Sequence, residues 1–247
     1  MKSILIRIVL ISFLLVLFIP NSAFAEMKTF IKEYTYNASE ADSKLSSRIN
    51  ATAEVKRLLL EELGTYLESI TEVKNFQLTK DQITTLTAGI VKTEIIAEKW
   101  NGEQYWIKTK IFVDADDVIK SIDKLRKDHN NLQELENTRK RVDVILEENK
   151  KLRNELARAT GNAKQEVQQR YDNSIKELSA VEWLQRGYSY YVKEDYETAI
   201  INYSKAIELY PNYDTAYIAR AFAYSKLGRK KEAKQDAIKA VAIRRNR

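Results

Sequence analysis

Apolar and polar residues alternate with two different periods in the first zone of the chain, residues 26–117. β-branched and aromatic residues over 29–36 predict a strand, because such side chains suit a pleated, half-buried surface. Apolar residues at three- and four-residue spacing over 39–69 predict a long amphipathic helix, and a shorter helix is expected over 80–86. This zone is therefore expected to be a small α+β domain.

A β-hairpin is expected at the end of this zone. Two β-rich runs, 90–100 and 104–113, flank the dipeptide Asn101-Gly102. This dipeptide favours a type I′ turn, in which both central residues need a positive φ. The acids of the following stretch, Asp114 to Asp117, lack the glycine and the terminal glutamate of a calcium loop. We interpret them as the cap and first turn of the next helix.

The second zone, residues 118–178, predicts one long helix that Gly161-Asn162 interrupts. From residue 117 to residue 159 such a helix would extend about 65 Å at 1.5 Å per residue, so we expect it to act as a spacer. Its pattern is typical of a coiled coil.

Positions in this helix that alternate by three and four residues form a seam. They hold Leu132, Leu135, Arg139, Val142, Leu146, Asn149, Arg153 and Leu156. A polar Asn149 among apolar residues specifies register and strand number in coiled coils, so the seam predicts a homo-oligomer. The alternative is a single amphipathic helix that packs on its own domains.

The third zone, residues 179–247, divides into two units of equal length, 180–213 and 214–247. Small and aromatic residues recur at matching unit positions: Trp183, Gly187, Tyr190, Ala199, Tyr203, Ala206 and Pro211 in the first unit, and Tyr217, Ala221, Tyr224, Ala233, Ala237 and Ala240 in the second. The small residues let two antiparallel helices approach closely, and the aromatic residues fill the gaps between them. This pattern resembles the tetratricopeptide (TPR) repeat family. The resemblance implies helix–turn–helix repeats that bind a protein or peptide partner.

In the TPR family the first helix of each repeat lines a concave surface. By this resemblance the surface is formed by Val181, Leu184, Tyr188, Tyr191 and Val192, then by Thr215, Ile218, Phe222, Ser225 and Lys226. Because Lys226 is the one cation there, we expect an apolar or amphipathic partner segment and not a free C-terminal carboxylate. The candidate partner-binding residues are Val181, Leu184, Tyr188, Tyr191, Ile218, Phe222, Ser225 and Lys226. The alternative is that the chain's own helix over 167–178 covers this groove.

A second resemblance lies in the first zone. The segments Gly64-Thr65-Tyr66-Leu67-Glu68-Ser69, Thr71-Glu72-Val73 and Leu86-Thr87-Ala88-Gly89-Ile90-Val91 precede the predicted hairpin. They resemble the N-terminal domain of the flagellar assembly protein T family. That resemblance implies a periplasmic domain that helps to build a ring at the base of the flagellum.

The first 25 residues resemble a secretory signal peptide. Lys2 and Arg7 precede an apolar run over 8–19, and Ala23-Phe24-Ala25 gives a cleavage pattern. We expect a mature protein that begins at Glu26, is periplasmic or secreted, and has no transmembrane anchor. An uncleaved N-terminal anchor is the alternative.

Composition narrows the possible functions. Six Gly and two Pro indicate a mostly helical chain, and the absence of Cys excludes disulfides, thiolate zinc sites and cysteine nucleophiles. His129 is the one histidine, so no paired-histidine metal site can form. No nucleophile–base pair or paired-carboxylate motif is found, so we expect no enzyme activity, no cofactor and no metal.

Charge is concentrated in the second repeat unit. Residues 214–247 hold ten Lys or Arg against three Asp or Glu, whereas the whole chain has a net charge of +6. Such a basic end could meet an acidic protein or acidic headgroups, and export disfavours nucleic acid. The alternative is a solvated cap that closes the repeat stack. Together these features predict an exported protein–protein interaction adaptor or, as the second hypothesis, a structural component of an envelope or flagellar-base assembly.

Overall fold

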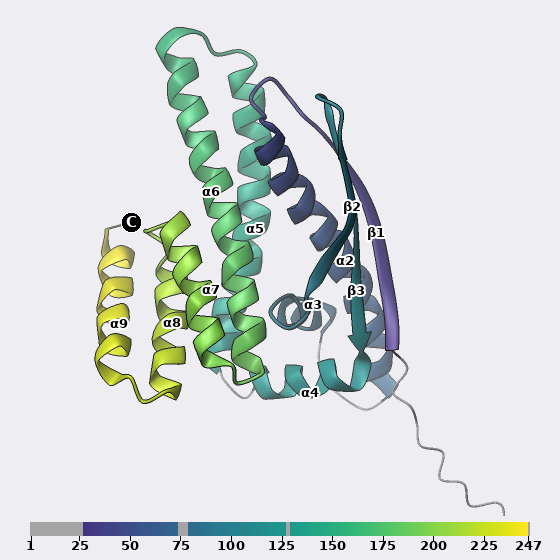
Figure 1. Ribbon diagram of the computed structural model, residues 1–247, viewed down its shortest axis with the longest axis vertical. Helices are drawn as coiled ribbons and strands as arrows, with labels where there is room; N and C mark the ends of the chain where they lie inside the picture. The colour runs from purple at the N-terminus through teal and green to yellow at the C-terminus, as the bar shows by residue number, and fades with distance from the viewer. Residues whose placement is uncertain (1–26, 74–78, 127–128, 247) are drawn as a thin grey trace, which may run out of the picture.

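The computed structural model describes residues 27–73, 79–126 and 129–246 of the chain. The predicted signal peptide, residues 1–25, lies outside the described residues. The elements in order are β1 (Met27–Asn37), α2 (Lys44–Val73), α3 (Lys80–Ala88), β2 (Thr93–Trp100), β3 (Gln104–Asp114), α4 (Ala115–Arg126), α5 (His129–Leu156), α6 (Gly161–Val192), α7 (Tyr196–Leu209), α8 (Asp214–Lys226) and α9 (Lys230–Arg245). The predicted fold class is confirmed: the chain is mainly helical, with an N-terminal α+β part and C-terminal helical repeats (Figure 1).

The sheet has the strand order β1-β3-β2, and both pairs of strands are antiparallel. Its inner face carries Phe30, Tyr36, Ile107 and Ile111, which are buried, and α2 packs across that face. The helix begins at Lys44 because Ser43 caps it: the Ser43 hydroxyl accepts a hydrogen bond from the Ser46 backbone N–H at 3.1 Å. Alternating side chains thus give the sheet one buried face and one solvent face.

The predicted hairpin is confirmed, but its turn is not type I′. Gly102 has φ +99°, whereas Asn101 does not have a positive φ. The Asn101 side-chain oxygen instead accepts hydrogen bonds from the backbone N–H groups of Glu103 at 3.0 Å and Gln104 at 2.6 Å. The Asn101 side chain thus stabilises the turn by hydrogen bonds to its backbone.

The acids after β3 cap a helix, as predicted. The Asp114 side chain accepts hydrogen bonds from the backbone N–H groups of Asp116 at 2.9 Å and Asp117 at 3.2 Å. Two otherwise unpaired donors of the first turn of α4 are therefore satisfied.

The prediction of one long spacer over 118–178 is wrong. The helix α4 crosses below the domain, α5 runs along it, and α6 returns antiparallel to α5 (Figure 1). The apolar residues of α4, Val118, Ile119 and Ile122, are buried against the domain, which folds the chain back on itself. No boundary exists at residue 178, because α6 continues without a break from Gly161 to Val192.

The predicted coiled-coil seam is also corrected. Leu135, Leu146, Asn149 and Leu156 are buried within their own chain, and the side chain of Leu132 lies outside the described residues. The Asn149 amide donates a hydrogen bond to Asn50 Oδ1 of α2 at 3.0 Å. The alternative, an amphipathic helix packed on its own domains, therefore describes α5, since its seam faces α2, α3 and α6.

A buried polar cluster joins the end of β1 to α2, α5 and α6. The Asp42 carboxylate is fully buried and pairs with Arg153 Nε at 3.1 Å. It also accepts hydrogen bonds from the hydroxyls of Tyr36, at 3.2 Å, and Tyr171. Burial, followed by the hydrogen bond to Asp42, raises the pKa of Tyr171 to about 12. This cluster ties the α5–α6 pair to the sheet domain.

One hydrophobic core runs through both halves of the molecule. It extends from Phe30 and Leu59, through Leu86 and Leu135, to the buried apolar residues of the first repeat. It also includes the small residues Ala216, Ala219 and Ala223 of α8. The α+β part and the first repeat therefore share one interior.

Candidate partner-binding site

The repeats form two helical hairpins, α6 with α7 and α8 with α9. In the first hairpin Gly187 allows the closest approach: a Cβ atom there would lie 2.3 Å from the ring of Tyr203. The Tyr203 ring also meets Tyr188 edge to face at a centroid distance of 5.6 Å. In the first hairpin Gly187 and Tyr203 thus take the roles that their spacing predicts, whereas Ala237 of the second hairpin is exposed.

The first four candidate binding residues are interior. Val181, Leu184, Tyr188 and Tyr191 are all buried, and Tyr188 is only 1% exposed. A partner could reach none of them without separating α6 from the rest of the protein. We therefore assign these four residues to the shared core.

The groove of the first repeat is covered, but not by the segment that was expected. Residues 167–178 are the first half of α6 itself, so they cannot fold over its second half. The cover comes instead from α3, α4 and α5. At Gly89, which follows α3, a Cβ atom would lie 2.8 Å from Leu135 and 3.5 Å from Tyr188. The α4 ammonium of Lys124 bonds the Val192 carbonyl at 3.3 Å.

The remaining four candidates stay accessible on α8. Ile218 and Phe222 are half-buried, whereas Ser225 and Lys226 are exposed. Beside them Glu194, in the turn after α6, pairs with Lys124 at 2.5 Å. The hydrogen bond from Lys124 lowers the pKa of Glu194, and the charges of Lys124 and Lys226 lower it further. The accessible surface is thus an apolar patch with a mixed, mainly cationic border.

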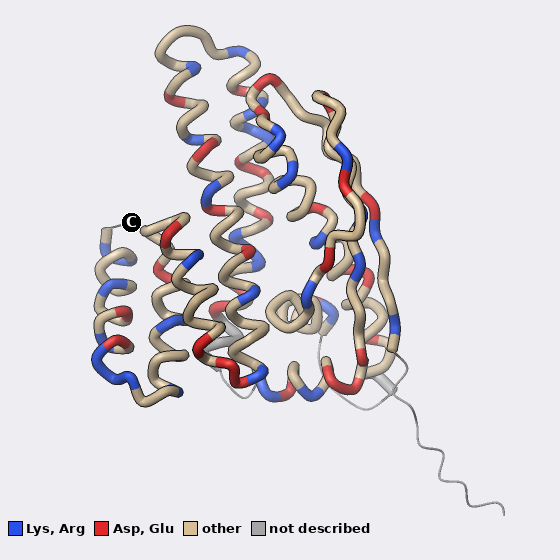
Figure 2. The backbone as a smooth tube through the Cα atoms, viewed as in Figure 1, with Lys and Arg blue, Asp and Glu red and all other residues tan. Residues whose placement is uncertain are grey.

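Lys and Arg are frequent along α8, α9 and the turn between them (Figure 2). Their contacts divide these basic residues into two groups. The first group makes ion pairs within the protein and consists of Arg220, Arg229 and Arg244. Arg220 pairs with Asp236 at 2.7 Å, and Arg244 joins α9 to Glu134 of α5 at 2.9 Å. The others are exposed on α8, α9 and the turn between them: Lys226, Lys230, Lys231, Lys234, Lys239 and Arg245. The exposed group gives this end of the molecule its positive charge.

Comparison with known families matches the region built from these hairpins. Residues 187–228 match the TPR repeat family, and residues 214–247 match the tetratricopeptide repeat family. The C-terminal region consists of TPR repeats. No curated protein and no solved structure matches the chain.

The TPR matches support a protein–protein interaction module in this region. They do not reach the α+β part, so the resemblance of that part to the flagellar assembly protein T family stays a prediction. Of the residues that the structure describes, no group of three or more His, Asp or Glu is placed to hold a metal ion. No helix within 27–73, 79–126 and 129–246 has the length and apolarity that a bilayer crossing needs.

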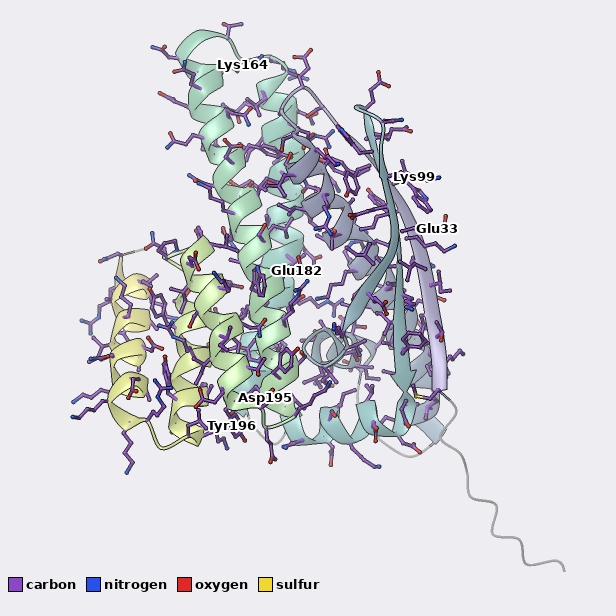
Figure 3. The ribbon with its side chains drawn as sticks, viewed as in Figure 1. Glu33, Lys99, Lys164, Glu182, Asp195 and Tyr196 are labelled. Atoms are coloured by element: carbon purple, nitrogen blue, oxygen red, sulfur yellow. The ribbon has the colours of Figure 1, made fainter. Side chains whose placement is uncertain are left out.

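Sequence reasoning missed the surface where the two halves meet. Lys56 of α2 donates a hydrogen bond to the side-chain oxygen of Gln185 on α6, and neither residue belongs to a motif. Glu182, labelled in Figure 3, lies one turn before Gln185. The apolar stripes of α2 and α6 predict burial, but they do not show which residues of distant helices meet.

Proposed function

We propose that this protein is an exported, non-enzymatic adaptor that holds a partner segment on its second TPR repeat. One observation carries the proposal: four positions that are buried in the first repeat are accessible in the second, where they hold Ile218, Phe222, Ser225 and Lys226. The signal-like residues 1–25 support export. We do not propose self-association through residues 118–160, because the predicted seam of α5 faces helices of its own chain.

The accessible patch defines the chemistry of the partner segment. Ile218 and Phe222 offer apolar contact, and a half-exposed aromatic side chain gives contact area at low entropic cost. Lys226 and the exposed cations of α9 favour an acidic group beside the apolar anchor. An amphipathic segment with acidic residues fits both features.

Photo-crosslinking from single positions tests this proposal. A photoreactive residue at Ser225 should give one dominant covalent adduct in envelope fractions, identified by mass spectrometry. The same residue at Lys205, exposed on α7, is the matched control and should give none. With the identified partner purified, Phe222→Ala and Lys226→Glu should each weaken binding at least tenfold. Equal adducts from both positions, or unchanged affinity in both variants, would contradict the proposal.

A structural role in an envelope assembly is the second candidate, and the sheet supplies its supporting observation. Met27, Ile31 and Phe112 are exposed together on the face of the sheet that α2 does not cover. A photoreactive residue at Phe112, and not at Ser225, should then give the dominant adduct.

A further inference from the structure

A cavity of about 440 Å³ lies between α2, α5 and α6, with α3 at one end. Cavities that hold small ligands measure roughly 300–1,000 Å³, so this one is large enough for a small molecule. It lies away from the accessible patch on α8. Its lining combines an apolar interior with a charged border.

The apolar part of the lining comes from three helices. It is formed by Ile49, Ala53 and Leu60 of α2, Val142 and Leu146 of α5, and Leu178 and Val181 of α6. From Lys56 to Ile49 the α2 wall runs for about 10 Å at 1.5 Å per residue. A wall of this length can accommodate a short extended alkyl chain.

Most charged groups of the border already have partners. Arg57 pairs with Glu54 at 3.1 Å and with Glu61 at 2.7 Å. Lys150 pairs with Glu147, and Arg139 with Asp81. Because these charged side chains already pair with one another, they do not need a charged ligand.

Lys56 is different. Its ammonium bonds the side-chain oxygen of Gln185, and within the described chain no carboxylate oxygen lies within 4.0 Å of it. Glu182 of α6, whose charge also acts on Lys56, accepts a hydrogen bond from Arg186 at 2.6 Å. Burial lowers the pKa of Lys56 to about 8; the charge of Glu182 raises it in part, and that of Arg186 lowers it. Lys56 is half-buried, and a partly desolvated cation without a counter-ion is stabilised when an anion joins it.

We propose that this cavity binds a medium-chain aliphatic carboxylate. The carboxylate pairs with the ammonium of Lys56, and the Gln185 amide provides the second polar contact. The alkyl chain lies along Ala53, Leu146 and Leu178 toward Ile49. Because the pocket buries the chain and one cation, it selects both the apolar length and the negative charge of the ligand.

Calorimetric titration of the full chain with decanoate, at concentrations below its micelle range, tests this site. We expect one binding site per chain for decanoate, with at least tenfold weaker binding of decanol and of decyltrimethylammonium. Equal affinity for the three compounds, or many equivalent sites, would show detergent-like adsorption and overturn the proposal.

Two lysines of the same lining provide a matched pair of variants. Lys56→Met keeps an unbranched apolar side chain and should weaken decanoate binding at least tenfold. Lys150→Met should change it less than twofold, because Lys150 pairs with Glu147. If Lys56→Met does not fold, Gln185→Leu replaces it, with an expected loss of at least threefold. Unchanged affinity in the folded variant that is used would contradict the assignment.

The pH dependence gives an independent readout. Charged groups that face the cavity, besides Lys56, are Glu54, Arg57, Glu61, Arg139, Asp143, Glu147, Lys150 and Glu182. A carboxylate ligand, with an ordinary pKa of about 4, remains ionised from pH 7 to pH 9.5. Affinity should therefore be constant up to about pH 8 and fall at higher pH as free Lys56 loses its proton. The same affinity at pH 7 and pH 9.5 would contradict the role of Lys56.

Discussion

Tyr188 in the first repeat and Phe222 in the second occupy the same position of the TPR unit, but their surroundings differ. Tyr188 is buried between α3 and α7, whereas Phe222 is half-buried on α8. The first repeat joins the core of the α+β part through apolar contacts. The second repeat adds only the small side chains of Ala216, Ala219 and Ala223 to that core, and Arg244 of α9 pairs with Glu134 of α5. A shared repeat pattern therefore fixes how the helices of a hairpin meet, and neighbouring elements decide which surface remains for a partner.

The largest expected effect comes from truncating the two equivalent aromatic residues. Tyr188→Ala should lower the free energy of unfolding by about 3–5 kcal/mol, because it leaves a cavity in the shared core. Phe222→Ala should cost about 1 kcal/mol, since its side chain keeps part of its contact with water. Urea unfolding measures both values. Equal losses in the two variants would show that the repeats are not buried differently.

Replacing Asn149 distinguishes a packed helix from a coiled-coil seam. Asn149→Leu should destabilise the protein by about 1–3 kcal/mol, because the side chains of Asn50 and Ser174 lose a buried hydrogen-bonding partner. Light scattering should show the same mass before and after the substitution. In a seam between two copies the change would raise stability and alter the mass, and that outcome would refute the packing of α5 described above.

Alkaline unfolding probes the attachment of α6 to the sheet domain. The pKa of Tyr171 is about 12 in the folded state and near 10 when unfolded, so the unfolded state loses the proton first. The contribution of Tyr171 to the free energy of unfolding is complete below pH 10. It decreases by about 1–2 kcal/mol as the pH rises to 12. The stability difference between the wild type and Tyr171→Phe should narrow over this range. A constant difference would contradict the burial of this hydroxyl.

The smallest effect is expected at the contact of α9 with α5. Arg244→Ala should cost about 1 kcal/mol, because the Arg244 side chain is half-exposed and such pairs are weak. Lys239→Ala, on the exposed side of α9, should change stability by less than about 0.5 kcal/mol. A loss from Arg244→Ala as large as that from Tyr188→Ala would contradict the assignment of this contact as a weak, half-exposed ion pair.

The sequence patterns predicted the individual helices and strands well, but they predicted poorly how these elements pack against one another. The spacing around Gly187 and Tyr203 predicted the TPR hairpins, and the run before Tyr36 predicted β1. The same apolar spacing in α5 fits a coiled coil and a buried helix equally, because a stripe does not show what covers it. Asn149 falls in the predicted seam, but its hydrogen-bond partner is Asn50 of the same chain, which is distant in sequence. The four predicted binding residues of the first repeat are buried for the same reason, because α3 and α5 cover them.

Native-state hydrogen exchange tests the central claim, that the first helix of the first repeat is interior whereas the second repeat keeps one face at the surface. Amides of α6 over 180–192 should exchange only through global unfolding, with the same opening free energy as the amides of α2. Amides of α9 should open at a lower free energy and with a weaker dependence on denaturant. Equal opening free energies for α6 and α9, or earlier opening of α6, would contradict the account.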